Sequence, residues 1–325
     1  MLVSFIIVAY NEEAYLPQLL GCLCEQDYPH SKIEVILIDS MSSDNTMGII
    51  KEFKREKENQ FYSIKLFENK NRTLPYGCNI ALRNYTGDAI VRLDGHAVIP
   101  PSFISDNVRI LNEGEDICGG RVDSILERES SMQKTLMLAE NSIFCGGIAP
   151  FRRLDKRAYV DTLAFAMYRR EVYDSVGEYN ENLSRTEDNE MHYRIREAGY
   201  KFCFIPQIES SRFTRNSFKK LLNQKFGNGV WIGATLKVCP KCFSIYHLVP
   251  GCFVLAIILT TLLLILGHPL FAILMWSMYF IADIGVSLFE MSRTQFLVTN
   301  LLLPLIFFLL HFVYGLGTLK GLIFE

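Results

Sequence analysis

Short runs of β-branched and aliphatic residues recur through the first 120 positions, and segments with helical periodicity lie between them. The apolar runs occupy residues 3–9, 33–38, 62–67, 89–93 and 116–118. The helical patterns between them occupy residues 13–26, 45–57, 74–84 and 102–112. Alternation of a fully apolar strand with a helix is typical of a parallel sheet covered on both faces. The pattern therefore predicts an α/β domain.

The first apolar run has no basic flank and is followed at once by Asn11-Glu12-Glu13. It lacks the charge and the length of a signal peptide, so we interpret it as a buried strand. Further along, the pattern predicts a strand at 159–166, a helix from Thr186-Glu187-Asp188 to about residue 198, and a strand at 201–205. Thr186 suits the N-cap of that helix and the two acids suit its N-terminus, which is by itself a purely structural explanation.

The C-terminal part of the chain has a different pattern. Three apolar segments, at about 248–266, 270–289 and 296–316, each approach the ~20 residues that a membrane-spanning helix needs. Residues 242–319 contain only three charged side chains, Asp283, Glu290 and Arg293. Asp283 should face protein or water, and the short turn Gly267-His268-Pro269 leaves a re-entrant hairpin open as an alternative to a third crossing.

A basic segment precedes the apolar region. Between Ser210 and Ala282 the chain has seven basic residues and no acidic one, and Phe218, Leu221 and Phe226 recur among the lysines at helical spacing. This favours an amphipathic helix on an anionic membrane surface over an ordinary surface helix. The positive-inside rule then predicts a multi-pass protein of the inner (plasma) membrane with its soluble domain in the cytoplasm. The expected domains are 1–209, 210–246 and 247–325.

Composition adds two limits. The formal net charge of −2 and a hydrophobic content of 50% exclude a disordered chain and a strongly basic nucleic-acid binder, so we expect no nucleic acid among the partners. The nine cysteines are odd in number and irregularly spaced, which favours a reduced compartment. Cys239 and Cys242 have the spacing of half a zinc site, but no second pair accompanies them, so we interpret them as structural or incidental.

Polar residues follow three of the predicted strands: Tyr10-Asn11-Glu12, Asp39-Ser40 and Asp94-Gly95-His96. Ligands of parallel sheets bind at the carboxyl ends of the strands. A carboxylate and an imidazole two residues apart suit Mn²⁺ or a similar divalent ion. The alternative is that they are an aspartate in a turn and a surface histidine that bind no metal. The chain has no Gly-x-Gly-x-x-Gly after its first strand and no Walker lysine loop, which argues against a dinucleotide fold and a P-loop ATPase.

Together with Thr186-Glu187-Asp188, these strand ends resemble the inverting family 2 glycosyltransferases. The resemblance implies a GT-A fold, with a Rossmann-like mixed sheet, followed by an α-helical transmembrane region. It further implies that Ala9, Tyr10, Glu12 and Asp39 hold the base and ribose of a nucleotide-sugar donor. The match to the family's aspartate-rich motif implies that Asp94, Gly95 and His96 bind the diphosphate and a divalent metal, Mn or Mg.

The motif departs from the usual Asp-x-Asp because His96 replaces the last acid, as it does in the mucin-type polypeptide sugar transferases. By the same resemblance, Asp188 is the general base that takes the proton of the acceptor hydroxyl. Glu187 is its neighbour and is expected to bind an acceptor hydroxyl. Arg72, after the third strand, could approach the nucleotide, and a solvated loop arginine is the alternative.

A longer string narrows the resemblance to the succinoglycan-type exopolysaccharide glucosyltransferases, which are membrane-attached. It includes Tyr159-Val160-Asp161-Thr162, Val176-Gly177-Glu178-Tyr179, Arg215, Gln224 and Trp231, and the last three are candidate acceptor or phosphate contacts. We therefore expect transfer of a hexose, with a UDP-linked donor, to a lipid-linked saccharide, and membrane lipids as partners. The alternatives are a polyprenyl-phosphate glycosyltransferase and a non-catalytic membrane scaffold that only binds a nucleotide-sugar.

Overall fold

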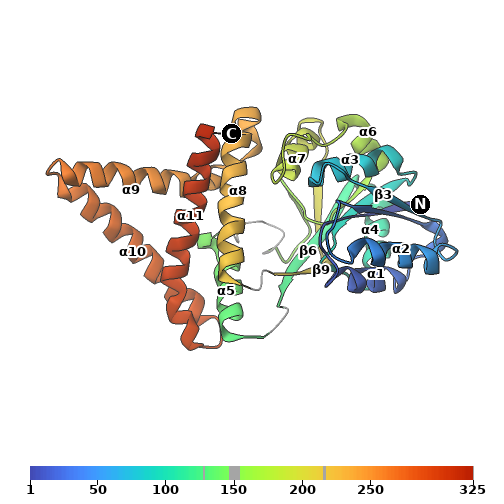
Figure 1. Ribbon diagram of the computed structural model, residues 1–325, viewed down its shortest axis with the longest axis horizontal. Coiled ribbons are helices and arrows are strands. Elements are labelled where there is room, and N and C mark those ends of the chain that lie inside the picture. Colours follow the sequence, from blue (N-terminus) through green and yellow to red (C-terminus); the bar gives the residue numbers. More distant parts are fainter. Residues whose placement is uncertain (127–128, 146–153, 215–216, 325) are drawn as a thin grey trace. The chain divides into compact units, whose positions relative to one another are not determined.

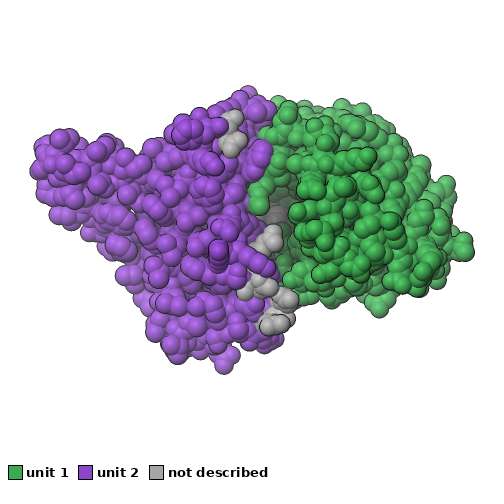
Figure 2. Space-filling model, in the orientation of Figure 1, with its two compact units in different colours: residues 1–125, 149–213 green, residues 126–148, 214–325 purple. Residues whose placement is uncertain are grey.

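The computed structural model describes residues 1–126, 129–145, 154–214 and 217–324. The chain forms two compact units, coloured separately in Figure 2. Unit 1 comprises Met1–Ile125 and Ala149–Phe213, and unit 2 comprises Leu126–Ile148 and Thr214–Glu325. The expected domain 1–209 thus differs from unit 1, because helix α5 (Ser131–Asn141) packs on the C-terminal helix α11 (Leu303–Phe324) within unit 2.

Nine strands of the described chain form one sheet in unit 1, in the order β3-β2-β1-β4-β8-β6-β9-β5, with β7 paired to β9. Their bounds are β1 Val3–Ala9, β2 Ile33–Asp39, β3 Ser63–Glu68, β4 Ala89–Asp94, β5 Ala97–Val98, β6 Ile117–Ile125, β7 Ala158–Val160, β8 Met167–Arg169 and β9 Phe202–Phe213. The first four strands are parallel, whereas β8 runs antiparallel to both β4 and β6. The sheet is therefore mixed, as the resemblance implies.

Helices cover both faces of this sheet (Figure 1). On one face lie α1 Leu16–Cys24, α2 Thr46–Lys57 and α4 Phe103–Asn112, whose Leu19, Ile50 and Ile104 join a core under β1. On the other lie α3 Leu74–Asn84, α6 Arg170–Val176 and α7 Glu187–Glu197, which bury Ala81, Val172 and Met191. Both cores are apolar layers of aliphatic and aromatic side chains, which explains why the strands appear as unbroken apolar runs in the sequence.

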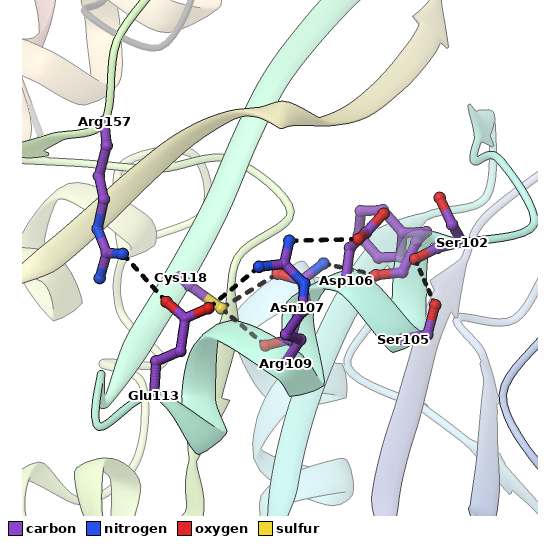
Figure 3. Close-up of polar contacts among 9 residues, drawn as sticks. Ser102, Ser105, Asp106, Asn107, Arg109, Glu113, Cys118 and Arg157 are labelled. Carbon is purple, nitrogen blue, oxygen red and sulfur yellow. Dashed lines mark hydrogen bonds and ion pairs between the residues drawn. The ribbon is translucent and has the colours of Figure 1, made fainter.

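Polar contacts hold α4 against its neighbours (Figure 3). The Sγ atom of buried Cys118 in β6 lies 3.3 Å from both the backbone oxygen and the side-chain Oδ1 of Asn107. Glu113, after the helix, accepts hydrogen bonds from Arg109 at 3.0 Å and from Arg157 at 3.1 Å. These contacts fasten the end of α4 to β6 and to the segment before β7.

Unit 2 is helical. It contains α5, η2 Ile143–Cys145, α8 Phe218–Val238, η4 Pro240–Cys242, η5 Ile245–His247, α9 Val249–Ile265, α10 Pro269–Ser292, η6 Val298–Leu302 and α11. Figure 1 shows α8 beside α11. Glycines permit this close approach, because a Cβ at Gly229 would lie 2.1 Å from the carbonyl oxygen of Tyr314 and one at Gly321 would lie 2.0 Å from that of Val230.

The helix expected on the membrane surface is therefore longer than the spacing of Phe218, Leu221 and Phe226 indicated, and α11 covers one of its faces. By length and apolarity, α10 and the segment Val298–Phe324 could each cross a membrane, whereas α9, with 17 residues, is shorter.

Two expectations from the sequence differ from the structure. Cys239 and Cys242 are joined by a disulfide, which differs from the expected reduced thiols. The strand expected at 159–166 is also wrong in extent, since β7 ends at Val160 and β8 begins at Met167.

A buried carboxylate ties three strands together at the amino ends of β1 and β2. Glu34 in β2 is fully buried, accepts hydrogen bonds from Ser4 and from the Thr86 hydroxyl at 2.8 Å, and lies 2.7 Å from the Lys65 ammonium. Burial alone would raise the pKa of Glu34, but the hydrogen bonds from Lys65, Ser4 and Thr86 outweigh it and lower that pKa. The stabilisation is therefore present at neutral pH and is lost as the pH falls through the lowered pKa.

We predict that Glu34→Gln destabilises unit 1 by about 2 kcal/mol, or ~5 °C in its unfolding temperature, because Lys65 loses its counter-charge and one acceptor oxygen becomes an amide NH2 that faces other donors. The measurement is thermal unfolding of the full chain in detergent at pH 7. Glu52→Gln, an exposed carboxylate on α2, is the matched control and should change little. Equal shifts for the two variants would contradict the assignment.

Candidate active site

The parallel register of β1, β2 and β4 brings three expected site residues to one edge of the sheet. Ala9 lies opposite Asp39, and its neighbour Val8 lies opposite Asp94. The chain remains paired just beyond the strands, because the Ser40 amide donates to the Ala9 carbonyl at 2.8 Å. The carboxyl ends therefore meet at a common level, where the sequence predicted a binding site.

The loops after β1 and β2 hold each other in place. Asp39 is buried and accepts a hydrogen bond from the Ser42 amide at 3.1 Å. Asn11, at a left-handed φ of 55°, donates its amide to the Ser42 hydroxyl at 3.0 Å and accepts from the Ser43 amide at 2.8 Å. The side chain of Tyr10, beside these hydrogen bonds, is about half exposed. The two loops therefore hold each other in one conformation, with the Tyr10 ring open to solvent.

His96 and Glu12 form a second contact at this edge. The Nδ1 atom of His96 lies 2.9 Å from Oε1 of Glu12, whose amide donates to Thr46 Oγ1 at 2.8 Å. A Cβ on Gly95 would lie 2.8 Å from Cγ of Glu12, so the glycine is what lets the carboxylate approach. With Nδ1 donating to a carboxylate, the imidazole lone pair is on Nε2, the tautomer used by metal-binding histidines.

A small cavity of about 90 Å³ is lined by residues of β4 and of α7. Asp94 and Asp188 both line it, as do two arginines, Arg92 and Arg212. Arg92 is two residues before Asp94, so the alternation of β4 puts both side chains on the same face. Its Nη2 atom lies 2.9 Å from Oδ2 of Asp188. Asp188, the expected base, and Asp94, the expected diphosphate ligand, thus line one cavity together with the two arginines.

Glu187 lies in a different environment from its neighbour. It is only 4% exposed, and burial, followed by the charge of Asp188, raises its pKa. Its Oε2 atom has no hydrogen-bond partner within the described parts of the chain, and the residue is not among those that line the cavity. A carboxyl group in such a place is disposed to stay protonated and to donate rather than accept a hydrogen bond.

Among the described residues that line the cavity, Arg72, Gln224 and Trp231 do not appear. Arg72 is exposed, at a φ of 62° in the turn after β3. Gln224 and Trp231 lie on α8 in unit 2, and Arg215 lies outside the described residues. Over the residues that the structure describes, no group of three or more His, Cys, Asp or Glu side chains could hold a metal. Asp94 and His96 would thus supply two protein donors.

Sequence reasoning assigned no role to several residues that line the cavity. Besides Arg92 these include His192 and three tyrosines, Tyr168, Tyr173 and Tyr179. His192 is buried, with Nδ1 2.8 Å from the Thr162 hydroxyl and Nε2 2.9 Å from the Tyr168 hydroxyl. The strand alternation at Arg92 and Asp94 was a usable signal for Arg92, and Tyr179 lies in a string that carries the family resemblance, whereas nothing local marks Tyr168 or Tyr173.

Several known proteins are similar to this chain. The model of the family "Glycosyl transferase family 2" matches residues 4–177. A dolichyl N-acetyl-α-D-glucosaminyl phosphate 3-β-D-2,3-diacetamido-2,3-dideoxy-β-D-glucuronosyltransferase of Methanococcus voltae is 28% identical, over 99% of this chain and 97% of the relative. The succinoglycan biosynthesis protein ExoA of Rhizobium meliloti is 25% identical, over 69% of this chain and 67% of that protein.

Among solved structures, the mannosyltransferase PcManGT of Pyrobaculum calidifontis, in complex with GDP-Man and Mn²⁺, has a similar fold. Its TM-score is 0.59 at 17% identity, and the match covers 99% of this chain and 87% of that one. The resemblance seen in the sequence is thereby confirmed, as are the mixed sheet and the enzyme class.

The His192 contacts generate a pH prediction. Burial lowers the pKa of His192 to about 4 in the folded chain, whereas an unfolded histidine titrates near ~6.5. As the pH falls below ~6.5 the unfolded chain binds the proton first, so the stability that this residue supplies is full above that value and declines toward pH ~4.

We predict that the free energy of unfolding of the wild-type chain falls more between pH 7 and 4.5 than that of His192→Gln, by an amount on the order of 1–3 kcal/mol, and that its unfolding temperature falls more steeply. The variant starts lower at pH 7, because Thr162 and Tyr168 lose a partner. Thermal unfolding at several pH values measures the difference. Parallel curves for the two proteins would show that His192 does not titrate as described.

Proposed function

The chain belongs to glycosyl transferase family 2, and we propose that it transfers a hexose from a nucleotide-sugar to a lipid-linked saccharide, with inversion at the anomeric carbon. The observation that carries the proposal is the cavity shared by Asp94, from the end of β4, and Asp188, from the start of α7. A donor diphosphate at Asp94 and an acceptor hydroxyl at Asp188 would flank the sugar from opposite sides.

In this proposal Asp188 accepts the proton of the acceptor hydroxyl as that oxygen attacks the anomeric carbon. A sugar hydroxyl is a weak nucleophile at neutral pH, so a positioned carboxylate is needed. The ion pair with Arg92, at 2.9 Å, orients the Asp188 carboxylate on the cavity wall. Glu187, which the resemblance assigns to an acceptor hydroxyl, is buried beside Asp188 and does not line the cavity, so we assign it no direct contact with the acceptor.

The donor is proposed to lie along the strand ends. Ala9, Tyr10, Glu12 and Asp39 would contact the base and ribose, while Asp94 and Gly95 border the diphosphate, and Arg72 would reach the nucleotide from its exposed turn. Arg212, which lines the cavity on β9, can pair with a phosphate oxygen. UDP is the nucleotide expected from the sequence resemblance, and PcManGT holds GDP-Man.

Asp94 and His96 would hold a divalent metal, Mn or Mg. These two side chains suit such an ion, because one supplies a carboxylate and the other an imidazole whose lone pair is on Nε2. Glu12 holds the imidazole ring in place through Nδ1, as carboxylates beside metal-binding histidines commonly do. Two protein ligands are enough for an ion that also binds phosphate oxygens. When bound, the metal neutralises the diphosphate and stabilises it as a leaving group. PcManGT contains Mn²⁺.

The acceptor is proposed to be lipid-linked because the Methanococcus voltae relative, which matches almost the whole chain, is named for a dolichyl phosphate sugar. The apolar helices of unit 2 favour action at a membrane, and the basic residues that precede them in the sequence are the ground for proposing that the catalytic domain is cytoplasmic. ExoA is named for succinoglycan biosynthesis, which supports synthesis of a cell-surface or exported polysaccharide.

A product assay would separate this function from formation of a lipid-phosphate sugar. The donors would be a panel of UDP- and GDP-sugars, the acceptor would be either a lipid-linked sugar or bare polyprenyl phosphate, and the products would be identified by mass.

We predict that Asp188→Asn lowers transfer by ~10²–10⁴-fold while the dissociation constant of the donor changes by less than about threefold, because the amide keeps the shape but cannot accept the proton. Initial rates and donor binding by calorimetry are the measurements. Glu197→Gln, exposed on the same helix, is the control and should retain full activity. Transfer that survives Asp188→Asn would remove this residue from the mechanism.

We predict that chelation of divalent metal abolishes transfer and that added Mn²⁺ restores it. His96→Asn should raise the Mn²⁺ concentration needed for half-maximal rate by ~10-fold or more, because one of two protein donors is weakened. The chelator saturated beforehand with Mn²⁺ is the control for side effects. Equal rates before and after chelation would undo the role of Asp94 and His96 as metal ligands.

A further inference from the structure

Unit 2 contains a cavity of about 480 Å³ that the proposed reaction centre does not use. It is enclosed by η2, α8, α9, α10 and α11, together with the turn η5 that precedes α9. Its volume falls in the range of small-molecule sites, ~300–1,000 Å³. All but three of its lining residues lie beyond residue 177, outside the part of the chain that the family model matches.

Aromatic side chains form much of the cavity wall. Phe253 of α9 stacks on Tyr279 of α10 with ring centroids 4.4 Å apart, and Phe144 of η2 meets His311 of α11 edge to face at 4.6 Å. The polar atoms of this wall face each other: the Tyr279 hydroxyl lies 3.1 Å from Nδ1 of His311, and Nε2 of His311 contacts the Phe144 carbonyl. The cavity therefore offers an occupant apolar ring faces.

One cation interrupts this apolar surface. Among the described residues that line the cavity, only Lys225 of α8 carries a permanent charge. Its side chain is 13% exposed, and its ammonium lies 3.9 Å from Oε1 of Glu140, at the outer limit of an ion pair. An ammonium with so distant a carboxylate can accept an additional anionic group.

We propose that this cavity binds the isoprenoid phosphate of the lipid-linked acceptor, with the first isoprene units against the aromatic wall and the phosphate at Lys225. The inference rests on the proposed function in that the acceptor is a lipid. A single enclosed volume with a single cation fits one methyl-branched chain with one anionic end, whereas a bilayer phospholipid has two chains. Neutral lipids would leave Lys225 without a phosphate.

A second apolar surface in unit 2 provides an internal comparison. The groove along α10 and the end of α9, with a volume of about 860 Å³, is lined by Trp276, Phe280 and other apolar residues, and by no charged residue within the described chain. Such a surface suits any lipid tail. Selective binding of an anionic isoprenoid should therefore be confined to the cavity at Lys225, and general lipid contact should occur at the groove on α10.

Photo-crosslinking of the full chain in lipid nanodiscs, without donor, tests the proposal. The probe is undecaprenyl phosphate with a diazirine on the isoprene unit next to the phosphate. We expect the labelled residues, identified by fragmentation of the peptides, to lie at or beside Phe144 or Phe253, and we expect unlabelled undecaprenyl phosphate to compete while phosphatidylglycerol does not. Labels only along Trp276 and Phe280, or equal competition by phosphatidylglycerol, would overturn the proposal.

Variants then test the two halves of the site. Lys225→Met should weaken competition by undecaprenyl phosphate roughly tenfold, because a charge-assisted contact is lost. Lys237→Met, exposed on the same helix and not lining the cavity, is the matched control. Ala282→Phe keeps the ammonium but fills the cavity, and should reduce labelling. Unchanged labelling of both cavity variants would contradict the assignment.

Binding of UDP-sugar to each variant shows that unit 1 remains folded. If a variant fails to fold, the labelling pattern of the wild-type chain still shows whether the probe binds in the cavity at Lys225 or at the groove on α10. The readout does not depend on transfer. Labelling in the cavity of a chain that transfers no sugar would therefore refute the proposed function alone. Transfer to a lipid acceptor without label in the cavity would refute only the cavity.

Discussion

The register of the parallel strands is the constraint on which the active site depends. Ala9 opposite Asp39 and Val8 opposite Asp94 set three strand ends at one level, and the loops that follow inherit that alignment. A slip of one residue would turn every side chain of a strand to the other face of the sheet. Because the side chains on both faces pack closely into cores under helices, such a slip would disrupt both cores, and the geometry of the polar edge is a consequence of core packing.

Charge balance governs the second level of organisation. Arg92 and Arg212 line the same small cavity as Asp94 and Asp188, and Arg92, which is mostly buried, pairs with Asp188. Unpaired charges there would be expensive, and the Arg92 to Asp188 pair avoids that cost without burying Asp188, which remains 41% exposed. A phosphate entering at Arg212 and a hydroxyl approaching Asp188 would meet groups already held in place.

Much of this arrangement could be predicted from the sequence because it is local. Unbroken apolar runs located β1, β2 and β4, and the polar residues after them located the site edge. The strand expected at 159–166 failed because the apolar residues Leu163 and Phe165 line the cavity from a loop, where burial does not require a strand. The extent of α8 was missed because Gly229 approaches Tyr314 across 85 positions, a contact with no local periodicity. His192 was missed for the same reason, since Thr162 and Tyr168 reach it from another segment.

The most direct test of the central claim is an experimental structure of the full chain with Mn²⁺ and a non-transferable nucleotide-sugar. The account predicts the anomeric carbon between Asp94 and Asp188, with the diphosphate on the Asp94 side and the Asp188 carboxylate facing the opposite side of the sugar. A sugar bound away from this cavity, or an Asp188 side chain separated from it by protein, would contradict the account.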